Sequence, residues 1–460
     1  MNNVLLIDFG STYTKITAVD VEQEQVLGTA RGITTVETDI MDGLNQALTD
    51  LFARTGKLEF SKVLGCSSAA GGLKMIAVGL VPEMTAEAAK RAALGAGAKV
   101  LKVFSHELSE YEIEEIAGLK PDIILLAGGT DGGNQKVILH NAKMLAELDM
   151  DVPVVVAGNK SVTPTVVKIL SEKHTEVRPT ENVMPKLDEL NIEPARVVIR
   201  DIFLKRITEA KGLNRANKMV DKMVMPTPAA VLNAAELLSQ GGGGEQGLGD
   251  LMVMDIGGAT TDVYSIAKGD PTVGGVSLKG LPEPFGKRTV EGDLGMRYSA
   301  GALLKAAGAE MIANNAGVTL AEAAEYVAKV EADIDHLPES QAEARIEIAM
   351  GKACVQLGAD RHAGHLAVYY TPFGTSHVQV GKDLTKVAIV IGTGGVIINN
   401  PEPEEILKGI LFDETNPQVL KPQKPKFLID NEYIMASMGL LGEEYPAVAV
   451  RMMKKYISKK

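Results

Sequence analysis

The sequence predicts an α/β protein with more than one domain, on three observations. The chain has 460 residues, which corresponds to about two to four domains at roughly 100–200 residues each. Its 45% apolar and 23% charged residues are typical of globular chains and not of disordered ones. Its 47 glycines gather directly behind short apolar runs, in segments 7–10, 124–133, 252–258 and 387–395. Strands that end in glycine turns are how α/β proteins bring backbone N–H groups to a phosphate.

Charge, cysteine content and hydropathy exclude several classes of protein. The chain has 47 Lys and Arg against 59 Asp and Glu, a net charge of −12, which disfavours nucleic-acid binding because that needs a basic surface. Cys66 and Cys354 are too few for a disulfide framework or a four-cysteine metal site. The first residues lack a signal-peptide pattern, and no apolar run reaches the roughly 18–20 residues that cross a bilayer. We therefore expect a cytoplasmic protein with neither nucleic acid nor membrane as a partner.

The first 200 residues alternate predicted strands and helices. Three strands are expected at 4–10, 15–20 and 25–32, followed by a helix at 40–55 and a strand at 61–69. Further on, we expect helices at 85–97, 109–119 and 134–148, and strands at 99–104, 121–129 and 152–159. Strands that alternate with helices of 10–15 residues indicate a parallel sheet.

The second half repeats the opening pattern. A helix predicted at 225–240 is followed by Gly241–Gly244, which we interpret as a linker because four glycines have high backbone entropy. A strand–turn–strand segment follows at 251–266, and a further strand and glycine turn at 386–395. Helices are predicted at 299–332, 339–357, 402–411 and 431–457, the last with a kink near Pro446.

Two hairpins share one pattern: LLIDFGSTYTKITAVD at 5–20 and MVMDIGGATTDVYSIA at 252–267. In each, an apolar strand reaches Asp-x-Gly, then small or hydroxyl residues, then a second strand. A single Asp-x-Gly is more often an ordinary turn. Two copies in matching context, with a third glycine turn at IGTGG, favour binding of Mg²⁺ and phosphate, with the hydroxyls of Ser11, Thr12, Thr260 or Thr261 on phosphate oxygens. The two hairpins are expected to close on a triphosphate, each from its own lobe.

The hairpins, together with PTPAAVLNAAELLS before the second, resemble the actin, sugar kinase and DnaK ATPase superfamily. The resemblance implies a two-lobed, ribonuclease H-like fold that binds ATP and Mg²⁺, with Asp8 and Asp255 as catalytic and metal-binding residues. IVIGTGG resembles the superfamily's adenosine motif. The remaining nucleotide-binding residues that the resemblance implies are Gly10, Ser11, Thr12 and Lys15 from the first hairpin, Gly257, Gly258, Thr260 and Asp262 from the second, and Gly392, Gly394 and Gly395 from the adenosine motif.

Three longer segments resemble sequences of the GlmL/MutL family: PDIILLAGGTDGGN, KRTVEGDLGMRYSAG and YYTPFGTSHVQVGKDLT. Members of that family are linked to adenosylcobalamin-dependent mutases such as glutamate mutase, and act as accessory or reactivating factors. The resemblance therefore implies a chaperone-like, slow ATPase whose partners are mutase subunits. Its name is shared with mismatch-repair MutL only by coincidence.

These interpretations define the expected organisation and chemistry. The first lobe is expected at 1–244, with an α/β insert at about 60–200, and the second at 245–460, with C-terminal helices that return to the first lobe. Asp255 is expected to orient or deprotonate the attacking water, and Asp8 to belong to the magnesium shell. Which mutase is served, and the oligomeric state, do not follow from the sequence.

Three other functions stay open from the sequence. A small-molecule kinase of the same fold would need a catalytic base for its substrate, and none is evident. An iron–sulfur dehydratase activator would need cysteines that bridge a dimer. A non-catalytic scaffold would merely hold the mutase.

Several other features of the sequence have two possible interpretations each. The glycine loop Ala127–Asn134 is either an anion cradle or interaction loop, or a plain β–α turn. His362 and His365 have metal-ligand spacing, but a helix-end pair or surface histidines are favoured. Segment 291–297 either lines the cleft or is a salt-bridged turn, and the 19 methionines are expected to fill the core.

Overall fold

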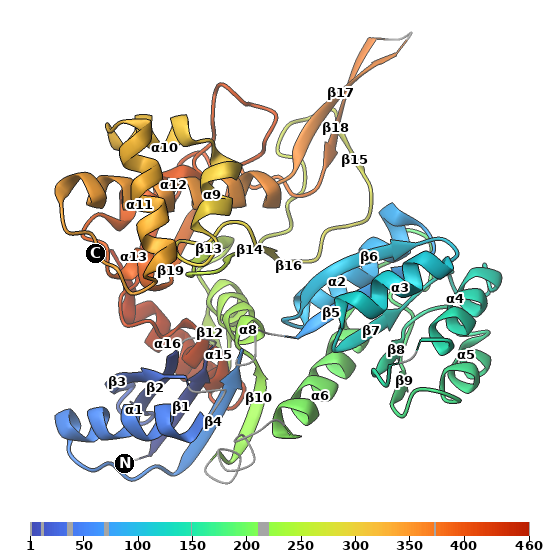
Figure 1. Ribbon diagram of the computed structural model, residues 1–460, viewed down its shortest axis with the longest axis horizontal. Coiled ribbons are helices and arrows are strands. Elements are labelled where there is room, and N and C mark those ends of the chain that lie inside the picture. Colours follow the sequence, from blue (N-terminus) through green and yellow to red (C-terminus); the bar gives the residue numbers. More distant parts are fainter. Residues whose placement is uncertain are drawn as a thin grey trace. The chain divides into compact units, whose positions relative to one another are not determined.

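The computed structural model describes residues 2–10, 13–34, 40–68, 73–148, 150–209, 220–371 and 374–459 (Figure 1). The chain divides into two compact units. Unit 1 comprises Met1–Asn233, Gly280–Pro282 and Ala436–Val448, and unit 2 comprises Ala234–Lys279, Glu283–Met435 and Ala449–Lys460. The predicted site residues Ser11 and Thr12 lie outside the described residues.

Unit 1 contains a five-stranded sheet of order β10-β4-β1-β2-β3. Its first three strands form an antiparallel meander, and β4 and β10 continue the sheet parallel to β1. Helix α1 (Ile40–Thr55) packs Leu44 and Leu51 onto the apolar face of this sheet. The strands are β1 (Asn3–Phe9), β2 (Tyr13–Asp20), β3 (Gln25–Ile33), β4 (Lys62–Ser67) and β10 (Lys222–Pro226).

The insert between β4 and β10 has a second sheet, of order β6-β5-β7-β8-β9, in which every pairing is parallel. This confirms the predicted parallel sheet. The strands are β5 (Lys74–Gly79), β6 (Lys99–Ser105), β7 (Ile123–Leu126), β8 (Val154–Val156) and β9 (Val177–Pro179). The helical segments are η1 (Pro82–Ala86), α2 (Glu87–Gly95), α3 (Glu110–Leu119), α4 (Lys136–Ala146), α5 (Thr163–Leu170) and α6 (Glu193–Glu209).

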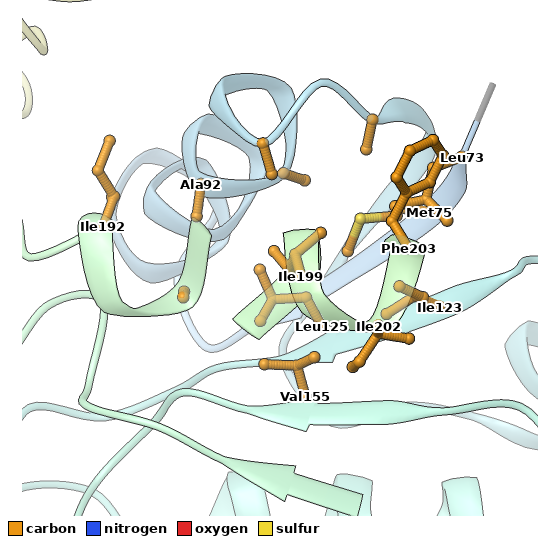
Figure 2. Close-up of a cluster of buried hydrophobic side chains, with 14 of the residues drawn as sticks. Leu73, Met75, Ala92, Ile123, Leu125, Val155, Ile192, Ile199, Ile202 and Phe203 are labelled. Carbon is orange, nitrogen blue, oxygen red and sulfur yellow. The ribbon is translucent and has the colours of Figure 1, made fainter. Parts of the chain in front are cut away.

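Apolar side chains of α6 fill the space between this sheet and α2. Figure 2 shows Ile199, Ile202 and Phe203 of α6 beside Ile123 and Leu125 of β7. All five side chains are almost fully buried. Burial of such side chains stabilises a fold by roughly 1.5–3 kcal/mol each, so the insert has a substantial core.

Unit 2 contains a sheet of order β16-β14-β13-β19-β20-β21. Strands β13, β14 and β16 form an antiparallel meander, and β19 and β20 run parallel to β13. The first five strands of this sheet and the five strands of the first sheet of unit 1 therefore lie in the same spatial order. Numbered along the chain within each sheet, that order is third, second, first, fourth, fifth. This repeat confirms the predicted actin-like, ribonuclease H-like fold. The strands are β13 (Leu251–Ile256), β14 (Thr261–Ile266), β16 (Gly286–Glu291), β19 (Ile389–Thr393), β20 (Lys426–Asp430) and β21 (Ile457–Ser458).

Helices cover the sheet of unit 2, and a smaller sheet extends from it. The helices are α9 (Ala300–Ala307), α10 (Ala309–Ala316), α11 (Leu320–Ala332), α12 (Gln341–His362), α13 (Gly395–Ile398), α14 (Pro403–Leu407) and η2 (Lys408–Ile410). Strands β15 (Val276–Lys279), β17 (His365–Thr371) and β18 (Gly374–Val380) form the smaller sheet (Figure 1). Many methionines fill these cores, including Met252, Met254 and Met350, as predicted.

The prediction that Gly241–Gly244 forms a linker is wrong. These glycines follow α8 (Thr227–Gln240) and form a tight hairpin, in which β11 (Gly241–Gly242) pairs with β12 (Glu245–Gln246). Gly241 has φ 84°, and a Cβ there would lie 2.1 Å from the carbonyl oxygen of Glu245. Gly241 is therefore required by its left-handed conformation in a close turn, and composition alone does not distinguish that requirement from flexibility.

The predicted kink near Pro446 is instead a break between two helices, α15 (Met435–Gly442) and α16 (Pro446–Tyr456). Proline fits the first turn of α16, where its missing N–H has no helical partner to lose. Within the described residues, no helix is both long and apolar enough to span a membrane.

Candidate functional site

Asp8 is the penultimate residue of β1 and accepts from two donors, one on the neighbouring strand β4 and one at the start of α8. The Thr227 hydroxyl, at the start of α8, donates to its Oδ1 at 2.5 Å. The Cys66 thiol on β4 donates to the same oxygen at 3.6 Å. Because β1, β4 and β10 are parallel, their carboxyl ends meet at one edge of the sheet, which places these three side chains together.

Cys66 acts here as a donor. Burial raises the pKa of this thiol well above its ordinary value, and the neighbouring Asp8 carboxylate raises it further. The protonated thiol can therefore donate to Asp8 and is not a nucleophile, since nucleophilic attack requires the thiolate.

Lys15 lies directly across from Asp8 in the register of β1 and β2. Opposed residues of an antiparallel pair have their side chains on one face, with Cβ atoms roughly 4.5–5.5 Å apart. The turn between them closes through the Gly10 N–H, which donates to the carbonyl of Tyr13 at 3.1 Å. A Cβ on Gly10 would lie 2.6 Å from that oxygen, so the turn requires glycine.

The second hairpin has a turn that other parts of unit 2 support. Gly257 N–H donates to the Thr260 carbonyl at 2.9 Å, which closes the turn. Arg297 N–H donates to the carbonyl of Gly258 at 2.8 Å, and Ser299 Oγ donates to that of Ala259 at 2.8 Å. The predicted residues Gly257, Gly258 and Thr260 therefore lie on a restrained turn beside Asp255, which is the penultimate residue of β13.

Asp262 already has a partner. The guanidinium of Arg288 lies 2.6 Å from its carboxylate, and the two side chains are only 4% (Arg288) and 15% (Asp262) exposed. The Thr260 hydroxyl is at 3.5 Å from the other carboxylate oxygen. This predicted site residue thus forms a buried ion pair that links β14 to β16.

The predicted adenosine turn lies against Asp255. Strand β19 pairs with β13 so that Thr393 is beside Asp255. Gly394 has φ 90°, and a Cβ there would lie 2.3 Å from the Ile256 carbonyl oxygen and 2.8 Å from Asp255 Oδ1. Gly395 is open, with its nearest contact at 3.8 Å, whereas a Cβ on Gly392 would meet Ile397 and Leu407. The structure therefore brings Gly394 and Asp255 together and places Gly392 in the core.

We expect Gly394→Ala to destabilise unit 2 by about 1–3 kcal/mol, because the added methyl group would overlap the backbone at the end of β13 in a left-handed conformation. Urea-induced unfolding followed by circular dichroism measures this loss. Gly395→Ala is the matched control, since its Cβ enters open space. Equal stability of the two variants would contradict the close packing of this turn.

Sequence reasoning missed the residues that support the predicted aspartates. They are Cys66 and Thr227 around Asp8, and the pair Thr393 and Asp430, in which the Thr393 hydroxyl donates to Asp430 Oδ2 at 3.0 Å. Asp430 also accepts from the N–H groups of Ile434 and Met435. Each lies at or just beyond the carboxyl end of a parallel strand, and that position is the signal that could have identified them.

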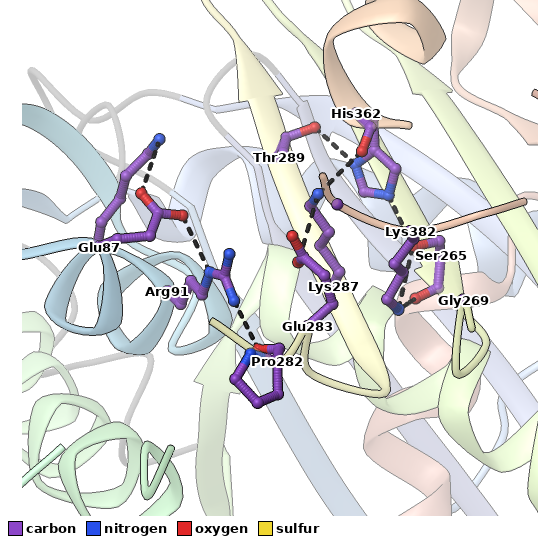
Figure 3. Close-up of polar contacts among 12 residues, drawn as sticks. Glu87, Arg91, Ser265, Gly269, Pro282, Glu283, Lys287, Thr289, His362 and Lys382 are labelled. Carbon is purple, nitrogen blue, oxygen red and sulfur yellow. Dashed lines mark hydrogen bonds and ion pairs between the residues drawn. The ribbon is translucent and has the colours of Figure 1, made fainter. Parts of the chain in front are cut away.

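His362 and His365 do not form a metal pair. His362 is fully buried at the end of α12, where Nε2 lies 2.8 Å from Ser265 Oγ and Nδ1 lies 2.9 Å from Thr289 Oγ1 (Figure 3). Burial lowers the pKa of His362 well below its ordinary value, and the cations Lys287 and Lys382 lower it further. His362 is thus a neutral, buried residue at the end of a helix, which agrees with the helix-end interpretation and contradicts that of a surface histidine.

The other candidate features have structural partners. Glu291 and Asp293 both pair with Arg361, which confirms the reading of segment 291–297 as a salt-bridged turn. The loop Ala127–Asn134 is held by Asn159, whose side chain accepts from Gly132 N–H and donates to the carbonyls of Gly133 and Asn134.

Both cysteines are fully buried, with Cys66 in unit 1 and Cys354 in unit 2. Burial raises the pKa of Cys354 to about 12. Neither thiol is available at the surface to bridge a dimer.

Two sheets of one topology, each with an aspartate before a glycine turn, define a protein of the actin-like ATPase fold class. The family model described as "MutL protein" matches residues 4–457. The chain belongs to this family. It is 54% identical over 462 residues to "Protein MutL" of Clostridium tetanomorphum, with 100% of each chain covered.

Solved structures of low sequence identity are also similar. Xylulose kinase from Lactobacillus acidophilus is 11% identical with a TM-score of 0.38, and the match covers 100% of this chain and 93% of the kinase. A diol dehydratase-reactivating factor, in nucleotide-free form, is 11% identical with a TM-score of 0.37, and the match covers 97% of this chain and 100% of the factor.

Proposed function

We propose that this protein is a Mg²⁺-dependent, ATP-binding and ATP-hydrolysing accessory factor that reactivates or chaperones an adenosylcobalamin-dependent mutase such as glutamate mutase. One observation carries the nucleotide part of the proposal: the penultimate residue of the first strand is an aspartate, followed by a glycine turn, in both sheets. The mutase part rests on membership of the MutL family.

The residues at these turns fit a magnesium nucleotide. Carboxylate oxygens, held directly or through water, are the ligands that Mg²⁺ prefers, and Asp8 and Asp255 supply them. Lys15, opposite Asp8, supplies a positive charge for a phosphate oxygen. Magnesium, when bound, would neutralise phosphate charge, which is most of what phosphoryl transfer requires.

Asp255 is the candidate to orient or deprotonate water. It is partly exposed, whereas Asp8 is buried at 6% exposure and accepts bonds from Thr227 and Cys66. A buried carboxylate is suited to a fixed position near the metal, and a more exposed one is suited to contact with water. On this basis, we assign Asp8 to the residues around magnesium, and we assign Asp255 to orientation or deprotonation of the attacking water.

Nucleotide can drive cofactor exchange only if the ATP and ADP states differ in affinity for the mutase, because a ligand shifts an equilibrium only through differential affinity. We expect affinity for the mutase to change at least about tenfold between the two states, or roughly 1.4 kcal/mol of coupling. The test is a titration of hydroxocobalamin-inactivated glutamate mutase with this protein in each nucleotide state, followed by addition of fresh adenosylcobalamin and assay of recovered activity.

Recovery of activity with ATP, but not with ADP or a non-hydrolysable analogue, would support the reactivating function. Equal affinities in the two states together with no recovery would contradict it and leave a scaffold. Phosphorylation of a metabolite in a panel incubated with ATP would instead support the kinase alternative.

A further inference from the structure

A histidine and two glutamates meet at the connection between α11 and α12 in unit 2, apart from the proposed nucleotide residues. One ring nitrogen of His336 and one carboxylate oxygen each of Glu339 and Glu343 all lie within 4.8 Å of one another. His336 Nε2 and Glu343 Oε2 are already 3.5 Å apart. Three ligands around a tetrahedral Zn²⁺, at roughly 2.0–2.1 Å each, would be about 3.3 Å apart, so only small movements separate this cluster from a metal site.

Ordinary helix capping explains part of the cluster. Ser340 Oγ accepts from Glu343 N–H at the start of α12, and Glu343 Oε2 accepts from Glu339 N–H at 2.7 Å. Lys329 Nζ lies 3.0 Å from both Glu339 and Glu343. These contacts give the two glutamates a structural role and do not involve the imidazole.

The imidazole of His336 is what capping leaves unexplained. His336 is only 8% exposed, and its buried Nε2 has no hydrogen-bond partner among the described residues although it faces Glu343. A buried polar atom without a partner costs roughly 1–3 kcal/mol. The ring is fixed by an edge-on contact with Tyr326, at 5.9 Å between centroids, so Nε2 stays directed at the carboxylates.

We propose that His336, Glu339 and Glu343 bind a divalent transition-metal cation of the zinc class. One imidazole and two carboxylates are a ligand set that zinc uses, with the fourth position left to water, whereas Mg²⁺ and Ca²⁺ prefer oxygen alone. Two carboxylates and a neutral imidazole balance the charge of one divalent cation. Lys329, 40% exposed, supplies only half of that charge and can move into solvent when the metal enters.

The site is connected to the second hairpin through one residue. The Arg297 guanidinium donates to the backbone carbonyl of His336 at 3.3 Å and forms a buried ion pair with Glu347 at 2.8 Å. The backbone N–H of Arg297 donates to Gly258. A metal on His336 would therefore restrain the loop that supports the 257–260 turn.

The test is zinc binding by the full-length chain without nucleotide, after treatment with a chelator and dialysis. Calorimetric titration with Zn²⁺ gives stoichiometry and affinity, and titration with Co²⁺ gives an absorption spectrum that reports the ligands. We expect about one equivalent to bind, and Glu339→Gln and His336→Ala each to weaken binding at least about tenfold. Glu339 is 72% exposed, so its substitution tests the site even if His336→Ala destabilises the fold.

Lys329→Gln separates a metal site from a purely ionic cluster. Because it removes the competing cation and keeps both carboxylates, we expect zinc to bind several-fold more tightly in this variant. Glu325→Gln, an exposed change on α11, is the matched control and should leave affinity unchanged. No zinc binding in the wild type and in Lys329→Gln, or binding that Glu339→Gln and His336→Ala do not weaken, would overturn the proposal.

Discussion

Asp8→Asn and Asp255→Asn are each expected to weaken binding or hydrolysis of Mg·ATP at least roughly a hundredfold, or about 2.8 kcal/mol. Each change removes a negative charge but keeps the shape of the side chain. Loss of a metal or phosphate contact in a site that excludes water has an effect of this size. Calorimetric titration with Mg·ATP measures affinity, and release of phosphate in single-turnover conditions measures hydrolysis.

The two variants are expected to impair different steps, one nucleotide binding and the other hydrolysis. Asp8 is buried and fixed by Thr227 and Cys66, so Asp8→Asn is expected to lose affinity. Asp255→Asn is expected to lose hydrolysis with binding largely retained, if the carboxylate acts on water. Wild-type affinity and wild-type hydrolysis in either variant would exclude that aspartate from the nucleotide site.

Asp20→Asn is the matched control for Asp8. Asp20 is also a buried aspartate of the first hairpin, at 4% exposure. It is the last residue of β2, whereas Asp8 lies near the turn that joins β1 to β2. Its Oδ1 accepts from the N–H groups of Glu22 and Gln23, and an asparagine oxygen can still do so. We expect nucleotide affinity within about twofold of wild type, since a change at this end of the sheet leaves the Asp8 edge unaltered.

The strands and turns of both hairpins could be predicted because their signal is local. Asp8 and Asp255 follow apolar runs and precede glycines within a few residues, and the same spacing occurs twice. What surrounds them is not local. Thr227 reaches Asp8 across 219 residues of sequence, through the parallel pairing of β10 with β4 and of β4 with β1. Such register is a tertiary property, so the sequence pattern offers no direct sign of this contact.

Two further features could not be predicted from the sequence, again because they depend on tertiary contacts. Asp262 matched a motif position, but its ion pair depends on Arg288 from β16, which is 26 residues away on the neighbouring strand. His336 showed no motif, because its spacing to Glu339 and Glu343 runs through a loop and then into α12. Periodicity predicts which residues share a face within one element, and it does not extend across a connection of irregular structure.

Arg288→Met is expected to destabilise unit 2 by about 3–5 kcal/mol, because it leaves the Asp262 carboxylate buried without its partner. The two side chains are 4% (Arg288) and 15% (Asp262) exposed, and Arg288 Nε also donates to Asp262 Oδ1 at 2.8 Å. Urea-induced unfolding measures the loss. Arg361→Met is the matched control: Arg361 is 38% exposed and its partner Asp293 is 42% exposed, although Glu291 is only 14% exposed, so the expected cost is smaller, about 1 kcal/mol.

The double variant Arg288→Met with Asp262→Leu tests what Asp262 does. Replacement of both members of a buried ion pair by apolar residues is often close to neutral, so we expect most of the lost stability to return. If Asp262 serves only to join β14 to β16, the double variant should bind Mg·ATP within a few-fold of wild type. A stable double variant that no longer binds nucleotide would instead assign Asp262 to the phosphate site, as the resemblance to the ATPase superfamily implies. Equal, small losses of stability in Arg288→Met and Arg361→Met would contradict the structural importance of the pair.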